Sequence, residues 1–293
     1  MNKMYNFNSV KIYLARKYYY VLKKTEKLRI RQAASARDTS SPELSIVILA
    51  WPPHYRDSRN YITLIESIKA TTKISYEIIL IFNSYTDEML DSIAKLTGDS
   101  SPIRFAVLNQ NIGVPRAWNV GAHMSEGNLL FFINEDVIVG KGCIDELTNT
   151  FTQNSNIGIA GPEGGFWDAD RGVPLSFVEL KSDINSCDAV SGFMFAIPKT
   201  ILGEAGGFDN NYTPCFFEEV DIGFRVRELG YQCVAVKGLE YFHKAGASSL
   251  KQWKRIFYLG ITEDMGTITN RNRSYFVDKW GRQRKGYLGN KEV

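Results

Sequence analysis

The sequence lacks the marks of several common protein classes. Its 293 residues include four cysteines, with no CxxC pair, and three histidines, so we expect neither a disulfide framework nor a Cys/His zinc site. No apolar run approaches the roughly 18–20 residues that span a bilayer. The N-terminus shows no apolar core followed by a small-residue cleavage site, as a signal peptide would. GxGxxG and GxxxxGK[ST] are both absent, which disfavours dinucleotide enzymes and P-loop NTPases. We therefore expect a globular, cytoplasmic protein.

Positive charge is concentrated near the N-terminus. Residues 1–38 carry ten Lys and Arg against two acids, a local charge of +8, and subtracting it from the total of +3 leaves −5. The segment is rich in Tyr, Leu and Ile and has no Gly or Pro, so residues 1–40 predict a basic helix. Such a helix can lie peripherally at the inner, anionic face of a membrane. A helix packed on the main domain and a solvated arm are the alternatives. No basic, aromatic-interleaved face follows, so we expect no nucleic-acid partner.

Apolar runs alternate with helical patterns through the first half of the chain. Strands are predicted at Leu44–Ala50, Tyr76–Phe82, Ile103–Leu108 and from Leu129. Helices are predicted from Ser58 through Ile68, from Thr86 to Leu96 and from Val114 to Ser125. This alternation is typical of an α/β fold whose parallel sheet is covered by helices on both faces.

The second half is less regular. We expect helices at Ile144–Phe151, Pro198–Ala205 and Phe216–Gly230, and strands at Ile157–Ala160, Ala189–Ile197 and Tyr231–Val236. Gly192 interrupts one of these strands, which often marks a close backbone approach. Gly161 to Pro174 is expected to be a loop that lines an acceptor groove.

Two acidic clusters are the candidates for chemistry. Glu135 and Asp136 follow an apolar strand, where ligands bind in open α/β sheets, and could hold a divalent cation. On this segment alone, an ordinary polar turn is the simpler explanation. Glu218, Glu219 and Asp221 fall in the first turn of a predicted helix. The helix dipole favours acids there, but three within four positions exceed what capping requires.

Taken in order, the elements resemble the family 2 glycosyltransferases, the inverting enzymes of the GT-A fold, a Rossmann-like mixed sheet flanked by helices. The resemblance runs from Leu44 to Ser248 and rests on the first strand and on Asn83–Asp87, Asn109–Gly113, Asn119–Gly121, Asn134–Asp136, Ser191–Gly192, Gly206–Asp209, Phe217–Asp221, Arg225, Gly230–Tyr231 and His243. Tyr275 to Gly281 is similar to the tail of bacterial rhamnosyltransferase-like members. The resemblance implies three regions: a basic segment at 1–40, the GT-A domain at 41–248 and a helical tail at 249–293.

The resemblance also implies roles for individual residues. Asn134–Asp136 takes the place of the metal-binding DxD motif, so Asp136 is expected to hold Mn²⁺ or Mg²⁺, with Glu135 in support. His243 matches a histidine that completes the metal shell, although a lone histidine after a strand is often structural. The nucleotide sugar is expected to contact Leu49, Ala50, Asn83, Asn111, Gly113, Asn119, Asn134 and Glu135. Phe82 stands where the family has an acid before Asn83, which leaves the nucleotide base open.

The implied reaction is sugar transfer from a nucleotide-diphosphate sugar to a hydroxyl of a glycan or a lipid-linked saccharide, as in bacterial polysaccharide biosynthesis. A hydroxyl is a poor nucleophile near neutral pH, so a carboxylate must accept its proton. Glu219 is the expected base, Glu218 is the alternative, and Asp221 would orient the acceptor.

Two other functions compete with this one. A nucleotidyltransferase would show a glycine-rich, basic loop after its first strand, whereas Ala50–Pro53 has neither feature. A non-catalytic sugar-binding protein of the same fold is the second. The donor sugar and the acceptor stay open.

Overall fold

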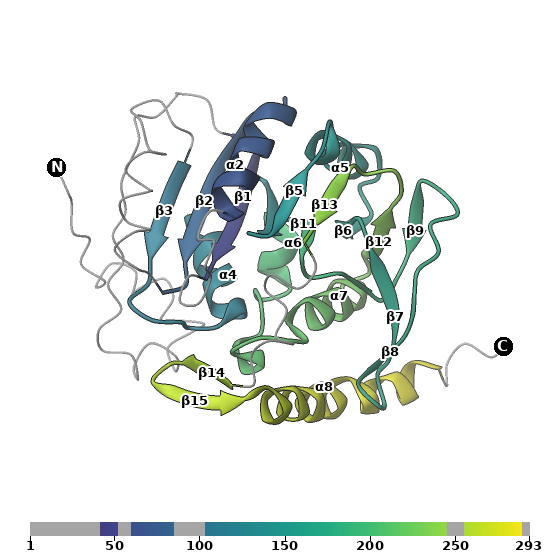
Figure 1. Cartoon of the computed structure of the whole chain (residues 1–293). Helices are drawn as coiled ribbons and strands as arrows, with labels where there is room; N and C mark the ends of the chain where they lie inside the picture. Colours follow the sequence, from purple (N-terminus) through teal and green to yellow (C-terminus); the bar gives the residue numbers. More distant parts are fainter. Residues whose placement is uncertain (1–41, 52–59, 85–102, 245–254, 289–293) are drawn as a thin grey trace.

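The computed structural model describes residues 42–51, 60–84, 103–244 and 255–288 (Figure 1). The predicted basic segment at 1–40, the Ser58 cap and the helix from Thr86 to Leu96 lie outside these residues.

The centre of the structure is a mixed sheet in the order β3-β2-β1-β4-β11-β6-β12-β9. Its strands are β1 (Leu44–Ala50), β2 (Tyr76–Phe82), β3 (Ile103–Val107), β4 (Leu129–Asn134), β6 (Ile157–Gly161), β9 (Ile184–Ser186), β11 (Met194–Pro198) and β12 (Gln232–Val236). β1 runs parallel to β2 and β4, and β2 runs parallel to β3, as the alternation predicts. β11 is antiparallel to β4 and β6. The carboxyl ends of β1 to β4 therefore lie along one edge of the sheet, where ligands bind in such folds.

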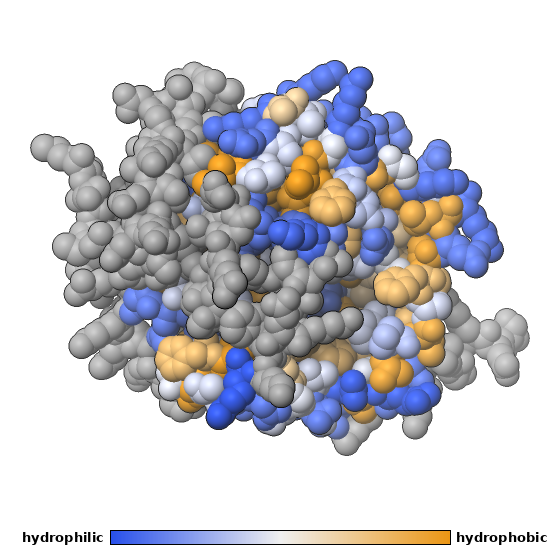
Figure 2. All heavy atoms as spheres, in the orientation of Figure 1, coloured by the Kyte–Doolittle hydropathy of each residue, from blue (hydrophilic) through white to orange (hydrophobic). Residues whose placement is uncertain are grey.

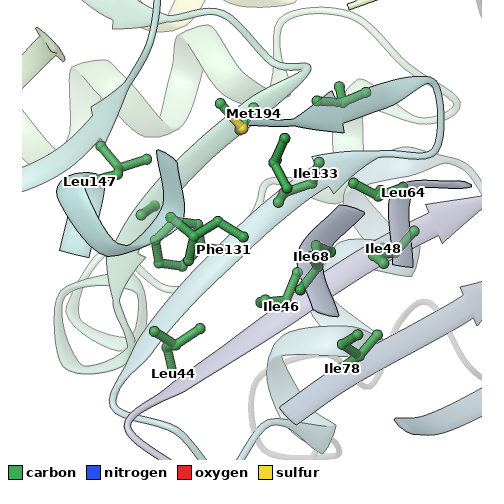
Figure 3. Close-up of a cluster of buried hydrophobic side chains, with 14 of the residues drawn as sticks. Leu44, Ile46, Ile48, Leu64, Ile68, Ile78, Phe131, Ile133, Leu147 and Met194 are labelled. Atoms are coloured by element: carbon green, nitrogen blue, oxygen red, sulfur yellow. The ribbon is translucent and has the colours of Figure 1, made fainter. Parts of the chain in front are cut away.

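Helices cover both faces of this sheet. α2 (Asn60–Thr71) and α5 (Cys143–Gln153) pack on one face, and α4 (Val114–Met124), α6 (Lys199–Glu204) and α7 (Glu218–Glu228) on the other. Successive strand side chains point to opposite faces. Ile46 and Ile48 accordingly pack with Leu64 and Ile68 of α2 (Figure 3), whereas Val47 joins the cluster that includes Trp118 of α4. The predicted α/β class is confirmed.

Three small sheets flank the main one. β5 (Val137–Val139) pairs with β13 (Tyr241–His243), and β7 (Gly164–Asp168) pairs with β8 (Val173–Phe177) and β10 (Ala189–Val190). The prediction of a loop from Gly161 to Pro174 is wrong, because much of this stretch forms the β7–β8 hairpin. The sequence gives little sign of these strands. Gly165 lies so close to β8 that a Cβ there would be 2.8 Å from the Ser176 carbonyl oxygen, and the outer strand exposes its apolar residues Leu175 and Phe177.

The C-terminal region begins with a hairpin. β14 (Arg255–Tyr258) and β15 (Ile261–Asp264) precede α8 (Met265–Leu288), so the expected helical tail also contains strands. Phe276 of α8 packs on Phe217 and Phe224, each with ring centroids 5.3 Å away. Among the described residues, no helix has the length and apolarity of a membrane span.

Candidate active site

Asp136 and His243 face each other beyond the end of β4. Pairing of β13 with β5 sets His243 opposite Val137, the residue after Asp136. The His243 Nε2 atom lies 3.5 Å from the Asp136 Oδ1 atom. The imidazole ring stacks on Phe193 with centroids 4.2 Å apart. Two residues that are more than one hundred positions apart in the sequence thus form a pair of adjacent polar side chains.

This pair has the atoms that a divalent cation requires. Carboxylate oxygen and imidazole nitrogen are both common metal ligands. The His243 Nε2 atom is buried and makes no hydrogen bond within the described part of the chain. No group of three or more His, Cys, Asp or Glu side chains with metal-binding geometry occurs among the described residues. A cation at this point would need further ligands from a bound substrate or water.

Glu135 points toward the first strand. Its Oε1 atom accepts a hydrogen bond from the Trp51 backbone N–H at 3.2 Å, which ties the end of β4 to the end of β1. Burial raises the pKa of Glu135 to about 8, and the negative charge of Asp136 adds to this shift. Near neutral pH this side chain therefore holds a proton in the metal-free protein.

Glu218 and Glu219 open α7 in a strained setting. Phe216 and Phe217, directly before them, have φ angles of +77° and +74°. Left-handed backbone at non-glycine residues costs about 1–3 kcal/mol each and clusters at functional sites. The Oε2 atom of each glutamate is buried and makes no hydrogen bond within the described part of the chain. Burial and the Glu219 charge raise the pKa of Glu218 well above its ordinary value, and burial also raises the pKa of Glu219.

One short turn contacts both acidic groups. A Cβ on Gly192 would lie 3.1 Å from Cγ and 3.2 Å from Cδ of Glu219, which is tighter than ordinary contact, so the glycine lets this side chain lie close against the turn. The next residue, Phe193, carries the His243 ring and accepts a hydrogen bond from the Asn134 N–H at 2.8 Å. The structure therefore brings the end of β4 and the start of α7 to neighbouring residues of the same turn.

Asn83, Asn111 and Gly113 form a network at the ends of β2 and β3. The Asn83 Nδ2 atom donates to the Asn111 Oδ1 atom at 2.9 Å, and the Gly113 N–H donates to the same oxygen at 2.9 Å. The Asn83 Oδ1 atom accepts from the Ile112 N–H at 2.8 Å. Both amides are buried, so they shape the loop at the sheet edge.

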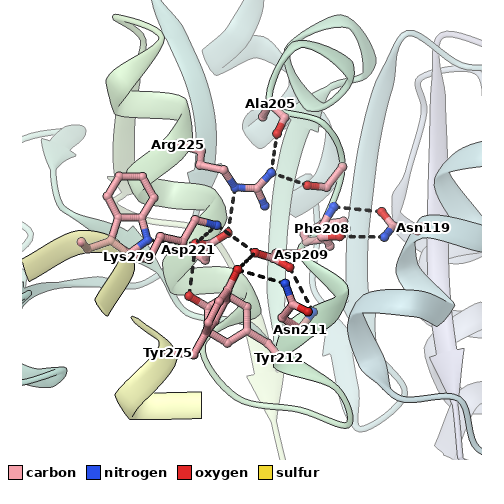
Figure 4. A network of polar contacts seen from close by, with 12 residues as sticks. Asn119, Ala205, Phe208, Asp209, Asn211, Tyr212, Asp221, Arg225, Tyr275 and Lys279 are labelled. Atoms are coloured by element: carbon pink, nitrogen blue, oxygen red, sulfur yellow. Dashed lines mark hydrogen bonds and ion pairs between the residues drawn. The ribbon is translucent and has the colours of Figure 1, made fainter. Parts of the chain in front are cut away.

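The other residues predicted to contact the nucleotide sugar lie in two places. Leu49 and Ala50 are buried within β1, and the Ala50 carbonyl accepts a bond from the Asn83 N–H. The Asn119 amide bonds both backbone polar groups of Phe208, at 2.8 and 2.9 Å, and so fastens α4 to the loop before α7 (Figure 4). These side chains support the site through backbone geometry.

Asp221 lies in a buried polar network instead of an open pocket (Figure 4). Its side chain is fully buried. The Oδ1 atom accepts from Trp280 Nε1 at 2.9 Å and contacts Lys279 Nζ at 2.8 Å, and the Oδ2 atom accepts from Arg225 Nε at 2.7 Å. The Tyr212 hydroxyl lies 3.3 Å from Oδ1. Asp221 thus joins α7 to α8, a role for which an acid in a first helical turn gives no signal.

The sequence did not point to the residues of α8 that meet the loop before α7. Ile268, Asn272, Phe276 and Trp280 recur every fourth position and are all buried. Asn272 is the polar member of this stripe. The one sequence feature that could have indicated Asn272 is its position as a single amide among apolar residues on one helix face.

Comparisons with known proteins find a family model, a related sequence and a similar fold. Residues 53–197 match the model of Glycosyl transferase family 2. Poly(ribitol-phosphate) beta-N-acetylglucosaminyltransferase TarP of Staphylococcus aureus strain N315 is 31% identical over 138 residues, which cover 44% of this chain and 38% of TarP. The crystal structure of GalNAc-T7 with UDP, GalNAc and Mn²⁺ aligns with a TM-score of 0.58 and 18% identity, covering 69% of this chain and 43% of that one. The chain therefore spans well under two thirds of either relative.

The mixed sheet and the helices that cover it have the GT-A fold. Residues 53–197 of this fold belong to glycosyl transferase family 2, as the order of the motifs predicted.

Proposed function

We propose that the protein is an inverting transferase that moves a sugar from a nucleotide-diphosphate sugar to a hydroxyl group, with Mn²⁺ or Mg²⁺ held by Asp136 and His243. The observation that carries this proposal is the turn at Gly192 and Phe193. It contacts Glu219 on one side and the His243 ring on the other. A sugar between them would meet a metal-binding point and a proton acceptor at once.

Glu219 is the proposed base. A general base works best when its pKa lies near the operating pH, and burial moves the pKa of Glu219 upward in that direction. Its partly open position beside Gly192 gives an acceptor hydroxyl access to the carboxylate. Glu218 is more deeply buried, so it would tune the Glu219 charge instead of meeting the acceptor.

The donor would lie along the ends of β1 to β4. Asp136 and His243 would hold the cation, which supplies positive charge to the departing diphosphate when bound. Asn134 and Glu135 would border the diphosphate. The loop shaped by Asn83, Asn111 and Gly113 would border the nucleotide base, with Leu49 and Ala50 contributing backbone and Asn119 holding α4 in register.

The acceptor side is partly apolar. Ile138 and Phe242, neighbours across the β5–β13 pair, are 39% and 61% exposed on the face of this pair that is turned away from the Val137 and His243 side chains. Figure 2 shows this apolar surface over β5 and β13. A glycan ring or a lipid-linked saccharide would pack there. The named relative acts on poly(ribitol-phosphate) with N-acetylglucosamine, so this polyol phosphate and that sugar are the first pair to test. Contact of residues 1–40 with a membrane belongs to the same proposal.

The decisive variant is Glu219→Gln, with Glu228→Gln as the matched control because Glu228 is an exposed acid on the same helix. Nucleotide sugars are first screened by thermal shift with Mn²⁺ or Mg²⁺, and transfer is then measured with the best donor. Loss of the base is expected to lower kcat by about 10²–10⁴-fold while donor affinity stays within about threefold. Full turnover by Glu219→Gln would reject the base assignment. Donor binding without transfer or hydrolysis by the wild-type chain would favour the non-catalytic alternative.

A further inference from the structure

The loop that leads into α7 has few backbone partners of its own. It runs from the 3₁₀ turn η1 (Asn210–Tyr212) to Phe217 and ends in the two left-handed residues Phe216 and Phe217. The backbone carbonyls of Tyr212, Cys215 and Phe216 accept their side-chain hydrogen bonds from a single residue of α8. Buried carbonyls of this kind require a donor.

That donor is Asn272. Its side chain is fully buried, and its Nδ2 atom lies 2.8 Å from the Tyr212 oxygen, 2.9 Å from the Cys215 oxygen and 3.3 Å from the Phe216 oxygen. The neighbouring Arg271 adds a bond from Nη2 to the Thr213 oxygen at 2.6 Å.

The rest of the same helix face contacts the chain on both sides of the glutamates. Phe276 packs on Phe217, and Trp280 and Lys279 bind Asp221. Contacts from α8 therefore bracket Glu218 and Glu219, with Phe217 directly before them and Asp221 two residues after them. Among these α8 residues, Asn272 is the one whose side chain bonds the left-handed backbone, at the Phe216 carbonyl.

We propose that Asn272 is a positioning residue, which holds the loop from Thr213 to Phe217 so that the Glu219 carboxylate stays against Gly192 and toward the acceptor. The catalytic half of this inference rests on the function proposed above. The structural half, that Asn272 holds the loop, does not.

The test compares Asn272→Ala and Asn272→Ser with Asn270→Ala. Asn270 is an exposed asparagine on the same helix, two positions away, and serves as the matched control. Hydrogen exchange by mass spectrometry of the peptide covering residues 213–219 reports on the loop without any need for activity. Steady-state kinetics then separate kcat from the KM of the donor, over a range of pH.

We expect residues 213–219 to exchange at least about tenfold faster in Asn272→Ala, while peptides from β1 and β4 exchange as in the wild type. kcat should fall about tenfold or more with the donor KM within about threefold, because misplacing a reacting group slows the chemical step. The acid limb of the kcat profile should move to lower pH, since a loosened loop admits water to the glutamates. Asn270→Ala should match the wild type in all three measurements. If Asn272→Ala does not fold, Asn272→Ser, which keeps one donor, should show the same changes to a smaller extent.

Wild-type exchange of residues 213–219 in a folded Asn272 variant would overturn the inference. Faster exchange with unchanged kcat and an unchanged acid limb would overturn its catalytic half. Absence of transfer by the wild-type chain would reject the proposed function, and with it the catalytic half, while the exchange data would still decide whether Asn272 holds the loop.

Discussion

Removal of the Asp221 carboxylate should destabilise the protein before it affects chemistry. Asp221 is fully buried, and the side chains of its partners Arg225 and Lys279 are 15% and 25% exposed. Asp221→Ala leaves the Trp280 N–H without its acceptor and removes the carboxylate between two cations, of which Lys279 keeps Asp209 and Arg225 keeps the Gly207 carbonyl. Breaking a buried ion pair by removal of one partner costs about 3–5 kcal/mol. This is a large share of the roughly 5–15 kcal/mol that stabilises a typical domain.

Thermal unfolding followed by circular dichroism measures this cost. At roughly 2–4 °C per kcal/mol for a protein of this size, the Tm of Asp221→Ala should fall by about 6–20 °C. Asp278→Ala, which removes an exposed acid of α8, should leave the Tm within about 2 °C, as surface substitutions usually do. Transfer is then assayed well below the lower Tm. Asp221→Ala that melts like the wild type but has lost transfer would refute this reasoning, because the carboxylate would then act on the substrate.

Three further predictions concern the other parts of the structure. Asp136→Asn should weaken Mn²⁺-dependent binding of the donor by about tenfold or more in isothermal titration, and unchanged binding would exclude Asp136 as a ligand. Glu135 has a folded pKa of about 8 against an ordinary 4.5, so the folded protein keeps a proton that the unfolded chain releases. The free energy of unfolding therefore falls by up to about 5 kcal/mol as pH rises between these values. With a chelator present, Glu135→Gln should therefore melt higher than the wild type at pH 8.5 and alike at pH 4; equal Tm values at both would contradict the shift. Trp118 packs on three phenylalanine rings at 5.0–5.5 Å, and Trp118→Ala should cost about 3–5 kcal/mol in denaturant unfolding, whereas a cost under 1 kcal/mol would show that the core is not packed as described.

The sheet could be predicted from the sequence because its signal is local. The strands at Leu44–Ala50, Tyr76–Phe82 and Leu129–Asn134 are buried along almost their whole length, so each is a mainly apolar run, with Ser45 and Glu77 as the polar residues inside the first two. α7 was predicted for a similar reason, from its apolar positions and the glycine that follows it. The β7–β8 hairpin was missed because its strands contain Gly164, Gly165 and Pro174 and expose their apolar side chains.

The site could be predicted only in part. Asp136 and Glu219 stand out as acids at places where a sheet binds ligands and a helix begins. Their approach to one turn depends on the β5–β13 pairing and on Gly192, which are contacts between distant segments. The position of Asp221 was not foreseeable from its own surroundings, since Lys279 and Trp280 come from a helix more than fifty residues later.

The most direct test of the account is a crystal structure of Glu219→Gln soaked with an intact nucleotide sugar and Mn²⁺. Anomalous scattering from manganese should place the ion between Asp136 and His243, with the anomeric carbon of the sugar facing the amide of residue 219 across the turn at Gly192. A sugar bound away from this turn, or manganese bound to other residues, would contradict the claim that the two acidic groups share one active site.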